Sequence, residues 1–117
     1  MPGQILIADG DPGVLAGLAA VCRKGGWAAC EARTAGEVLA LARSEHPDVC
    51  LLDLDLAGAG LELLRELVAL REAPSVVLLT SLADVPTAVA AMRQGAAEFL
   101  EQPVRRLVQE GVLERVL

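Results

Sequence analysis

The chain is poor in aromatic residues and has few cationic ones. Its 117 residues include one Phe, one Trp and no Tyr, and 10 Lys and Arg stand against 16 Asp and Glu, for a formal net charge of −6. A protein that binds the phosphate backbone of a nucleic acid needs clustered Lys and Arg side chains, and one that stacks on bases needs aromatic rings. We therefore expect no direct binding of nucleic acid by this chain.

Long hydrophobic runs are also missing, although 54% of the residues are hydrophobic. Charges interrupt the apolar stretches, so none reaches the roughly 18 to 20 residues that a membrane span needs. The first residues, MPGQ, lack the basic start of a secretory signal, and the apolar run after them is cut at Asp9. These absences predict no membrane segment and a cytoplasmic protein.

The cysteines do not form a recognisable framework. Cys22, Cys30 and Cys50 are odd in number and show no CxxC spacing. Cys22 falls in a helical pattern, and the other two fall in strand-like runs. Neither a disulfide network nor a cysteine metal site is expected, and we predict three buried free thiols.

Strand-like apolar runs alternate with helical patterns along the whole chain. The expected strands cover residues 5–8, 27–32, 49–52, 76–79 and 97–101. The expected helices cover residues 12–24, 35–45, 61–71, 84–94 and 105–116. Asp11 and Thr34 are typical helix N-caps, Glu37 completes a capping box with Thr34, and Gly25 and Gly95 are typical helix ends.

This order of elements favours a doubly wound α/β fold. The central strands are continuously apolar, which is typical of a parallel sheet that is covered by helices on both faces. At 117 residues there is room for one core, so we expect a single domain over residues 1–117. In such sheets ligands bind at the carboxyl ends of the strands.

Polar side chains stand at the ends of three expected strands. Asp9 ends ILIAD, Asp53 ends PDVCLLD, and Thr80 ends VVLLT. Asp55 follows Asp53 by two residues. Because the carboxyl ends of parallel strands meet at one edge, we expect a small acidic pocket there. Such a pocket could hold a cation and a phosphoryl group.

Three ordered blocks of the sequence resemble the receiver domain of two-component response regulators. They are ILIADGDPGV, PDVCLLDLDLAGAGLELLREL and VVLLTSLADVPTAVAAMRQGAAEFLEQPV, and the resemblance covers residues 4–116. The last block is similar to receivers found ahead of DNA-binding output domains in nitrogen-type regulators. The resemblance implies a flavodoxin-like (βα)5 fold with a five-stranded parallel sheet in the order 2-1-3-4-5.

The resemblance implies a role for each residue of the pocket. Asp53 would accept a phosphoryl group from a histidine kinase, giving an aspartyl phosphate. A Mg²⁺ would be held by Asp9, by Asp53 and by the main-chain carbonyl of Asp55. Thr80 would swing toward the attached phosphoryl group, and Phe99 would turn inward with it.

The resemblance also implies a phosphate side and a partner face. Ser81 and Gln102 stand at the positions that lie beside the phosphoryl group in the family. The face made by residues 84–94, 97–101 and 105–116 would rearrange on phosphorylation and serve homodimers or other partners.

Two positions depart from the family pattern. Gly10 stands where receivers usually carry a second acid that is a direct metal ligand, and Gln102 stands where they carry a lysine that pairs with the phosphoryl oxygens. Both changes weaken the charge complementarity of the site, because charge-assisted bonds are the stronger ones. Asp11 is expected to cap the first helix instead of replacing the acid, while the side chain of Asp55 could replace it.

Three functions stay open at this point. The chain could be a working receiver, or a degenerate receiver that acts as a phosphorylation-independent interaction module. A remote alternative is a haloacid-dehalogenase-like phosphohydrolase, because Asp53 and Asp55 have the spacing of its two acids. That class also needs a lysine, and no lysine follows Thr80. We therefore expect no enzyme.

Overall fold

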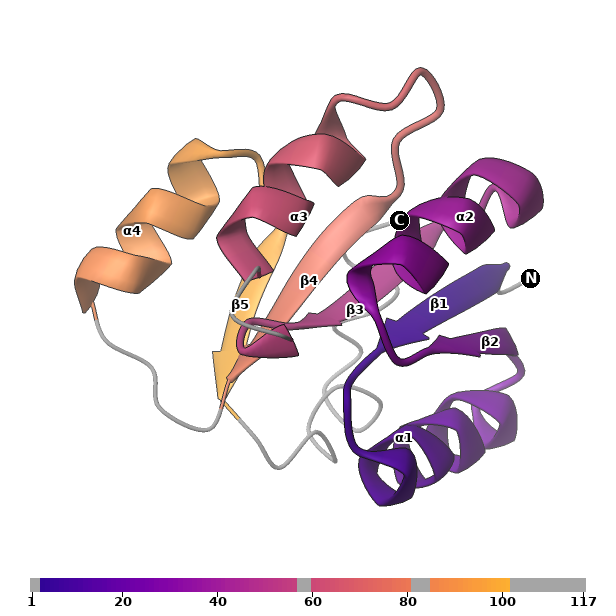
Figure 1. Cartoon of the computed structure of the whole chain (residues 1–117). Coiled ribbons are helices and arrows are strands. Elements are labelled where there is room, and N and C mark those ends of the chain that lie inside the picture. The colour runs from indigo at the N-terminus through magenta and orange to yellow at the C-terminus, as the bar shows by residue number, and fades with distance from the viewer. Residues whose placement is uncertain (1–2, 57–59, 81–84, 102–117) are drawn as a thin grey trace.

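The computed structural model describes residues 3–56, 60–80 and 85–101 of the chain (Figure 1). The strands are β1 Gln4–Ala8, β2 Ala28–Ala32, β3 Val49–Asp53, β4 Ser75–Thr80 and β5 Glu98–Glu101. The helices are α1 Pro12–Lys24, α2 Ala35–Glu45, α3 Gly60–Val68 and α4 Val85–Arg93. The helix expected over residues 105–116 lies outside the described residues.

The five strands form one parallel sheet in the order β2-β1-β3-β4-β5. The predicted α/β fold and strand order are therefore confirmed. The register pairs Ala8 with Leu52 across β1 and β3, and Leu52 with Leu78 across β3 and β4. Because all strands run the same way, their carboxyl ends meet at one edge of the sheet.

Helices cover both faces of the sheet. Figure 1 shows α1 on one face and α2, α3 and α4 on the other. The core divides in the same way, because successive side chains of a strand point to opposite faces. The cluster under α1 includes Ile5, Ile7, Leu15, Leu18, Trp27, Leu51 and Leu79. The cluster under the other helices includes Leu6, Val38, Leu52, Leu63, Leu64, Leu67 and Leu78.

The first two helices begin at the caps that the sequence predicts. The Asp11 carboxylate accepts hydrogen bonds from the amides of Gly13, at 2.8 Å, and Val14, at 3.3 Å. The Thr34 hydroxyl accepts one from the Glu37 amide at 3.2 Å, and the Glu37 carboxylate accepts one from the Arg33 amide at 3.0 Å. The reciprocal bond of the capping box thus reaches one residue further back than the usual pattern.

Helix α3 is shorter than predicted. It ends at Val68, whereas the periodicity extended it to Arg71. The Leu70 amide bonds to the Leu67 carbonyl at 3.2 Å, which tightens the last turn. Pro74 follows, and a proline disfavours helical backbone in the residue before it. The chain therefore turns into β4 earlier than the apolar spacing indicates.

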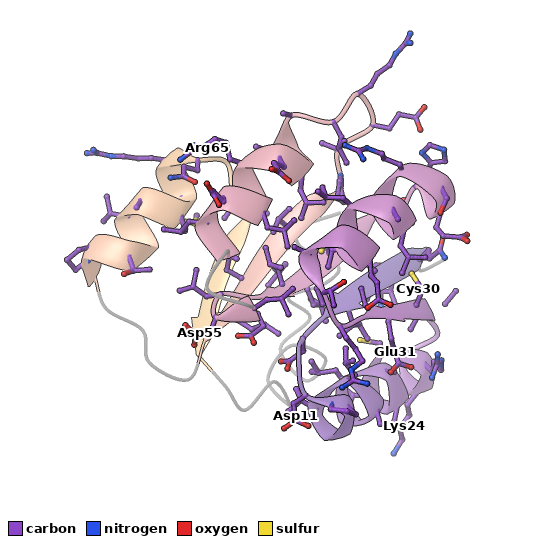
Figure 2. All side chains as sticks on the ribbon, in the orientation of Figure 1. Asp11, Lys24, Cys30, Glu31, Asp55 and Arg65 are labelled. Carbon is purple, nitrogen blue, oxygen red and sulfur yellow. The ribbon has the colours of Figure 1, made fainter. Side chains whose placement is uncertain are left out.

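The cysteines are free, as predicted, but they are not equally buried. Cys22 and Cys50 are buried, while Cys30 is only half-buried, so the prediction of burial is wrong for Cys30. Cys30 lies on β2, which is one of the two edge strands of the sheet (Figure 2). An edge strand has a neighbour on one side only, and its side chains are correspondingly less covered. No helix within the described ranges is long and apolar enough to cross a membrane.

Candidate functional site

The acidic residues gather at the carboxyl edge of the sheet, as the sequence predicts. Asp53 is the last residue of β3, and Asp9 directly follows β1, whose Ala8 pairs with Leu52. Asp9 and Asp53 are therefore the next residues on two adjacent strands. Asp9 is only 6% exposed and Asp53 is half-buried. Two carboxylates are thus held side by side at the sheet edge, with little water around one of them.

Both carboxylates are oriented by the main chain that follows them. The Asp11 amide donates a hydrogen bond to Oδ1 of Asp9 at 2.9 Å, and the Asp55 amide donates one to Oδ1 of Asp53 at 3.1 Å. These are local turns in which an Asp side chain bonds to the backbone two residues on. In each carboxylate Oδ2 carries no hydrogen bond to any residue that the structure describes.

The two further acids lie on the loops beside this pair. Figure 2 shows Asp11 at the start of α1 and Asp55 just after β3, at the same edge of the sheet. Both side chains are exposed. The carboxylate of Asp11 caps α1, as predicted. In the described part of the chain, no three His, Cys, Asp or Glu side chains lie close enough together to hold a metal ion.

The environment of Asp53 makes its charge unfavourable. Burial raises the pKa of this carboxyl above its ordinary value, and the negative charges of Asp9 and Asp55 raise it further. The hydrogen bond from the Asp55 amide acts in the opposite direction, because it stabilises the charged form. A half-buried acid with a perturbed pKa is typical of functional sites.

The remaining predicted residues are located only in part. Thr80 ends β4 and pairs with Glu101, and Phe99 lies in β5 and pairs with Leu78. Thr80 therefore lies at the same edge as Asp53, since Asp53 pairs with Leu79. The side chains of Thr80 and Phe99 are not among the described ones, and Ser81 and Gln102 lie outside the described residues.

Two residues to which the sequence assigned no role support the loop after Asp53. Leu56 is 2% exposed and packs in the cluster under α2, α3 and α4. A Cβ on Gly60 would overlap the main-chain carbonyl of Leu54, so the start of α3 packs directly on the backbone next to Asp53. Two signals in the sequence could have found these residues. Gly60 belongs to a glycine-rich turn, and the apolar Leu56 directly follows Asp55.

The fold and this site together define a receiver domain. The sequence matches the family model described as response regulator receiver domain over residues 5–110, and the chain belongs to this family. The family is a signalling module and not a catalytic enzyme, so the phosphohydrolase alternative is excluded. Membership implies a histidine kinase as partner, and receiver domains typically bind Mg²⁺.

Several known proteins are similar to the chain. The nitrogen assimilation regulatory protein NtrX of Azorhizobium caulinodans is 36% identical over 108 residues, which cover 88% of this chain and 23% of NtrX. Protein PilH of Pseudomonas aeruginosa is 36% identical over 104 residues, which cover 86% of each chain. The crystal structure of a CheY-like receiver domain from Methanospirillum hungatei superposes with a TM-score of 0.88 at 29% identity, over 99% of this chain and 94% of that one.

The relatives differ in how much of their length the chain spans. It covers about a quarter of NtrX and of the transcriptional regulatory protein GlrR of Escherichia coli, at 23% of each, but most of PilH. The likeness to NtrX and GlrR therefore concerns one segment of each regulator.

Proposed function

We propose that this chain accepts a phosphoryl group from a histidine kinase on the carboxylate of Asp53. The observation that carries the proposal is the asymmetry of this side chain. Its Oδ1 is held by the Asp55 amide at 3.1 Å, whereas Oδ2 has no bond within the described residues. Asp53 is half-buried at the carboxyl end of β3, which is the sheet edge where ligands of such folds bind.

The proposed transfer forms one bond and breaks one. Oδ2 of Asp53 attacks the phosphorus of a phosphohistidine, the phosphorus–nitrogen bond breaks, and its electron pair stays on the imidazole nitrogen of the donor. Phosphoryl transfer asks a protein mainly for positioning and charge stabilisation, with little covalent help. The hydrogen bond from the Asp55 amide supports the positioning, because it fixes the rotation of the carboxylate.

The described acids provide an incomplete set of ligands for Mg²⁺. Asp9, Asp53 and Asp55 are the proposed metal residues, but only the first two carboxylates lie at adjacent strand ends. Gly10 has no side chain that could serve as a ligand. The carboxylate of Asp11 caps α1. No metal group of three such side chains occurs within the described ranges.

We also propose the switch that the family resemblance implies. Thr80 and Phe99 would change position when the phosphoryl group is attached, and the face made by α4, β5 and residues 105–116 would rearrange with them. Ser81 and Gln102 would lie beside the phosphate. The exposed apolar side chains of Val89, at 44%, and Met92, at 48%, support a partner or homodimer at α4. A cytoplasmic location and a single domain over residues 1–117 remain predictions.

A second function is favoured by one observation. With Gly10 in place of an acid, and Gln102 in place of a lysine, the site has lost charge on both sides of the phosphoryl group. A receiver of this kind could act as a phosphorylation-independent interaction module. The two functions differ in a single measurable property, which is the modification of Asp53.

The test is to incubate the protein with Mg²⁺ and acetyl phosphate and to measure its mass. We expect one added phosphoryl group on the wild-type chain and none on Asp53→Asn, which has nearly the same shape. An unmodified wild-type chain at millimolar donor and Mg²⁺ would favour the interaction module. A modified Asp53→Asn chain would place the phosphoryl group on another residue.

A further inference from the structure

The outer side of β2 has no neighbouring strand. β2 stands at one end of the sheet and pairs only with β1 among the described residues (Figure 1). The amide of Ala28 and the carbonyl of Ala32 bond to the residues that flank β1. The main-chain groups of alternate residues in a strand point to opposite sides, so those of Ala29 and Glu31 point outward. These two residues form the outer edge of β2.

The strand itself carries little protection against pairing with another chain. A row of unpaired main-chain groups is a template for a further strand, and proteins usually block such a row with Lys, Pro or a bulge. β2 has the sequence AACEA, with neither Lys nor Pro, and its register with β1 is continuous. Glu31 is its only charged residue. Any further protection of the outer edge must therefore come from another element.

Arg23, in the last turn of α1, supplies a side chain that covers this edge. Its Nη2 donates a 3.1 Å hydrogen bond to the carbonyl of Ala29 and lies 3.9 Å from Oε2 of Glu31. Both side chains of the ion pair are partly exposed, so the pair itself adds little stability. The guanidinium thus contacts both residues whose main-chain groups point outward.

The position of this guanidinium is incompatible with a neighbouring strand. Paired strands lie about 4.8 Å apart, and their N–H···O hydrogen bonds are about 2.9 to 3.0 Å long. At 3.1 Å from the outward carbonyl of Ala29, Nη2 of Arg23 takes the place of a partner strand's amide nitrogen. A further strand can pair with β2 only if Arg23 moves away.

The outer edge is complementary to a second copy of itself. If two copies of β2 run antiparallel, with the two-fold axis beside Cys30, then Ala29 of each copy lies opposite Glu31 of the other. Both residues point their main-chain groups outward, so each pair can exchange two hydrogen bonds. An interface between identical copies requires this kind of self-complementarity. One of the acceptors in it is the Ala29 carbonyl that Arg23 now occupies.

We propose that Arg23 blocks an interface on the outer edge of β2, and that a second copy of the chain pairs there, antiparallel, when the guanidinium is removed. The sheets of the two copies then form one continuous sheet. The interface lies at β2 and involves neither Asp53 nor α4. It can therefore be tested, and can fail, independently of the proposed phosphoryl transfer.

The test is analytical ultracentrifugation of the full chain over a range of protein concentrations. Arg23→Ala should form a species of twice the monomer mass at concentrations where the wild-type chain shows none. Lys24→Ala is the matched control and should behave as wild type, because it removes an exposed cation from the same helical turn. Arg23→Ser removes the same contacts as Arg23→Ala and should dimerise as well. Circular dichroism checks that each variant is folded.

A second substitution locates the interface. The Ala29 amide points outward, so Ala29→Pro removes a donor from the edge without removing a bond to β1. The double variant Arg23→Ala with Ala29→Pro should be monomeric again. Hydrogen exchange gives a direct readout, because the amides of Ala29 and Glu31 become paired in the dimer. They should exchange at least about tenfold more slowly in Arg23→Ala than in wild type.

Four results would overturn the proposal. The Arg23 variants could stay monomeric, or Lys24→Ala could dimerise to the same extent. A dimer that persists with Ala29→Pro, or that leaves the exchange of the Ala29 and Glu31 amides unchanged, would lie on another surface. Arg23→Ala and Arg23→Ser chains that both fail to fold would show that Arg23 is required for the fold and does not merely block an edge.

Discussion

The main-chain amide of Asp55 donates a 3.1 Å hydrogen bond to Oδ1 of Asp53, across the turn that leaves β3. The bond stabilises the ionised carboxylate, while burial and the charges of Asp9 and Asp55 oppose ionisation. Burial is the largest of these effects, so the pKa of Asp53 lies above its ordinary value. A raised pKa means that ionisation of Asp53 costs free energy in the folded chain, and this cost lowers the stability of the fold.

The stability of the Asp53→Asn variant relative to wild type should depend on pH. The pKa of Asp53 is higher in the folded chain than in the unfolded one, so its stabilising contribution is complete below the unfolded value of about 3.9 and is lost as the pH rises through the folded value. The asparagine side chain of the variant does not titrate. The Tm of Asp53→Asn should therefore exceed that of wild type by more at pH 7 than at about pH 3.

Thermal unfolding by circular dichroism at a series of pH values measures this difference. Glu66→Gln, which changes an exposed carboxyl on α3, is the matched control and should show a smaller pH-dependent difference. The same Tm offset between Asp53→Asn and wild type at both pH values would contradict the prediction. In that case the substitution would act through packing and not through charge.

Removing the cap of α1 should destabilise the protein. Asp11→Ala leaves the amides of Gly13 and Val14 without their acceptor, and the loss should be about 1 kcal/mol in the free energy of unfolding. Asp11→Asn keeps an acceptor oxygen and should retain most of the stability. Urea unfolding measures both. An equal loss in the two variants would show that the charge, and not the hydrogen bond, is what stabilises the helix.

Two glycine-to-alanine changes should have opposite signs. Gly60→Ala places a Cβ against the carbonyl of Leu54 and should cost about 1 to 3 kcal/mol, because backbone must shift next to Asp53. Gly17→Ala has nothing within 4 Å of its Cβ and lies inside α1, so it should stabilise the fold by about 0.5 to 1 kcal/mol. Denaturant unfolding of both variants compares them. A neutral Gly60→Ala would mean that α3 can move away from Leu54 at little cost.

One of the three thiols should react first. Burial raises the pKa of Cys22 to about 11 and that of Cys50 to about 12, and the pKa of the half-buried Cys30 is raised as well. The thiolate is the reactive form and must be accessible. A limiting amount of iodoacetamide at neutral pH should therefore label Cys30 slowly and the other two hardly at all.

Peptide mapping after alkylation identifies the labelled cysteine. Cys30→Ser should remove nearly all labelling of the folded protein, and urea should then expose Cys22 and Cys50. Rapid labelling of Cys50 without denaturant would be inconsistent with its position in the centre of the sheet, where it is fully buried. It would indicate that β3 opens while the rest of the chain stays folded.

Much of the fold was readable from local patterns. Asp11 and Thr34 mark helix starts because their side chains accept amides that would otherwise lack a partner. Gly95 ends α4 with a φ of 105°, a conformation that favours glycine. The end of α3 was not readable in this way. The spacing of its apolar residues continues past Val68, but the turn before Pro74 and the start of β4 determine where the helix stops.

The contacts of individual exposed side chains with distant residues were not readable from the sequence. Nδ1 of His46 lies 2.8 Å from Oε2 of Glu72, although 26 positions separate them in the sequence. Both side chains are exposed, so the pair adds little stability. His46 ends α2 in the left-handed region, with φ 48° and ψ 56°. Its αL conformation and its partner both depend on how α2 meets the turn after α3.

The sequence by itself determined the order of the elements, the parallel sheet and the placement of Asp9, Asp53 and Thr80 at strand ends, because alternation, caps and apolar runs are local properties of a chain. The structure decided which oxygens of the Asp9 and Asp53 carboxylates have no hydrogen bond to the described residues. It also decided that position 10 has room for a Cβ while position 60 does not. The space around a residue is set by residues that lie elsewhere in the chain, so it exists only once the chain has folded.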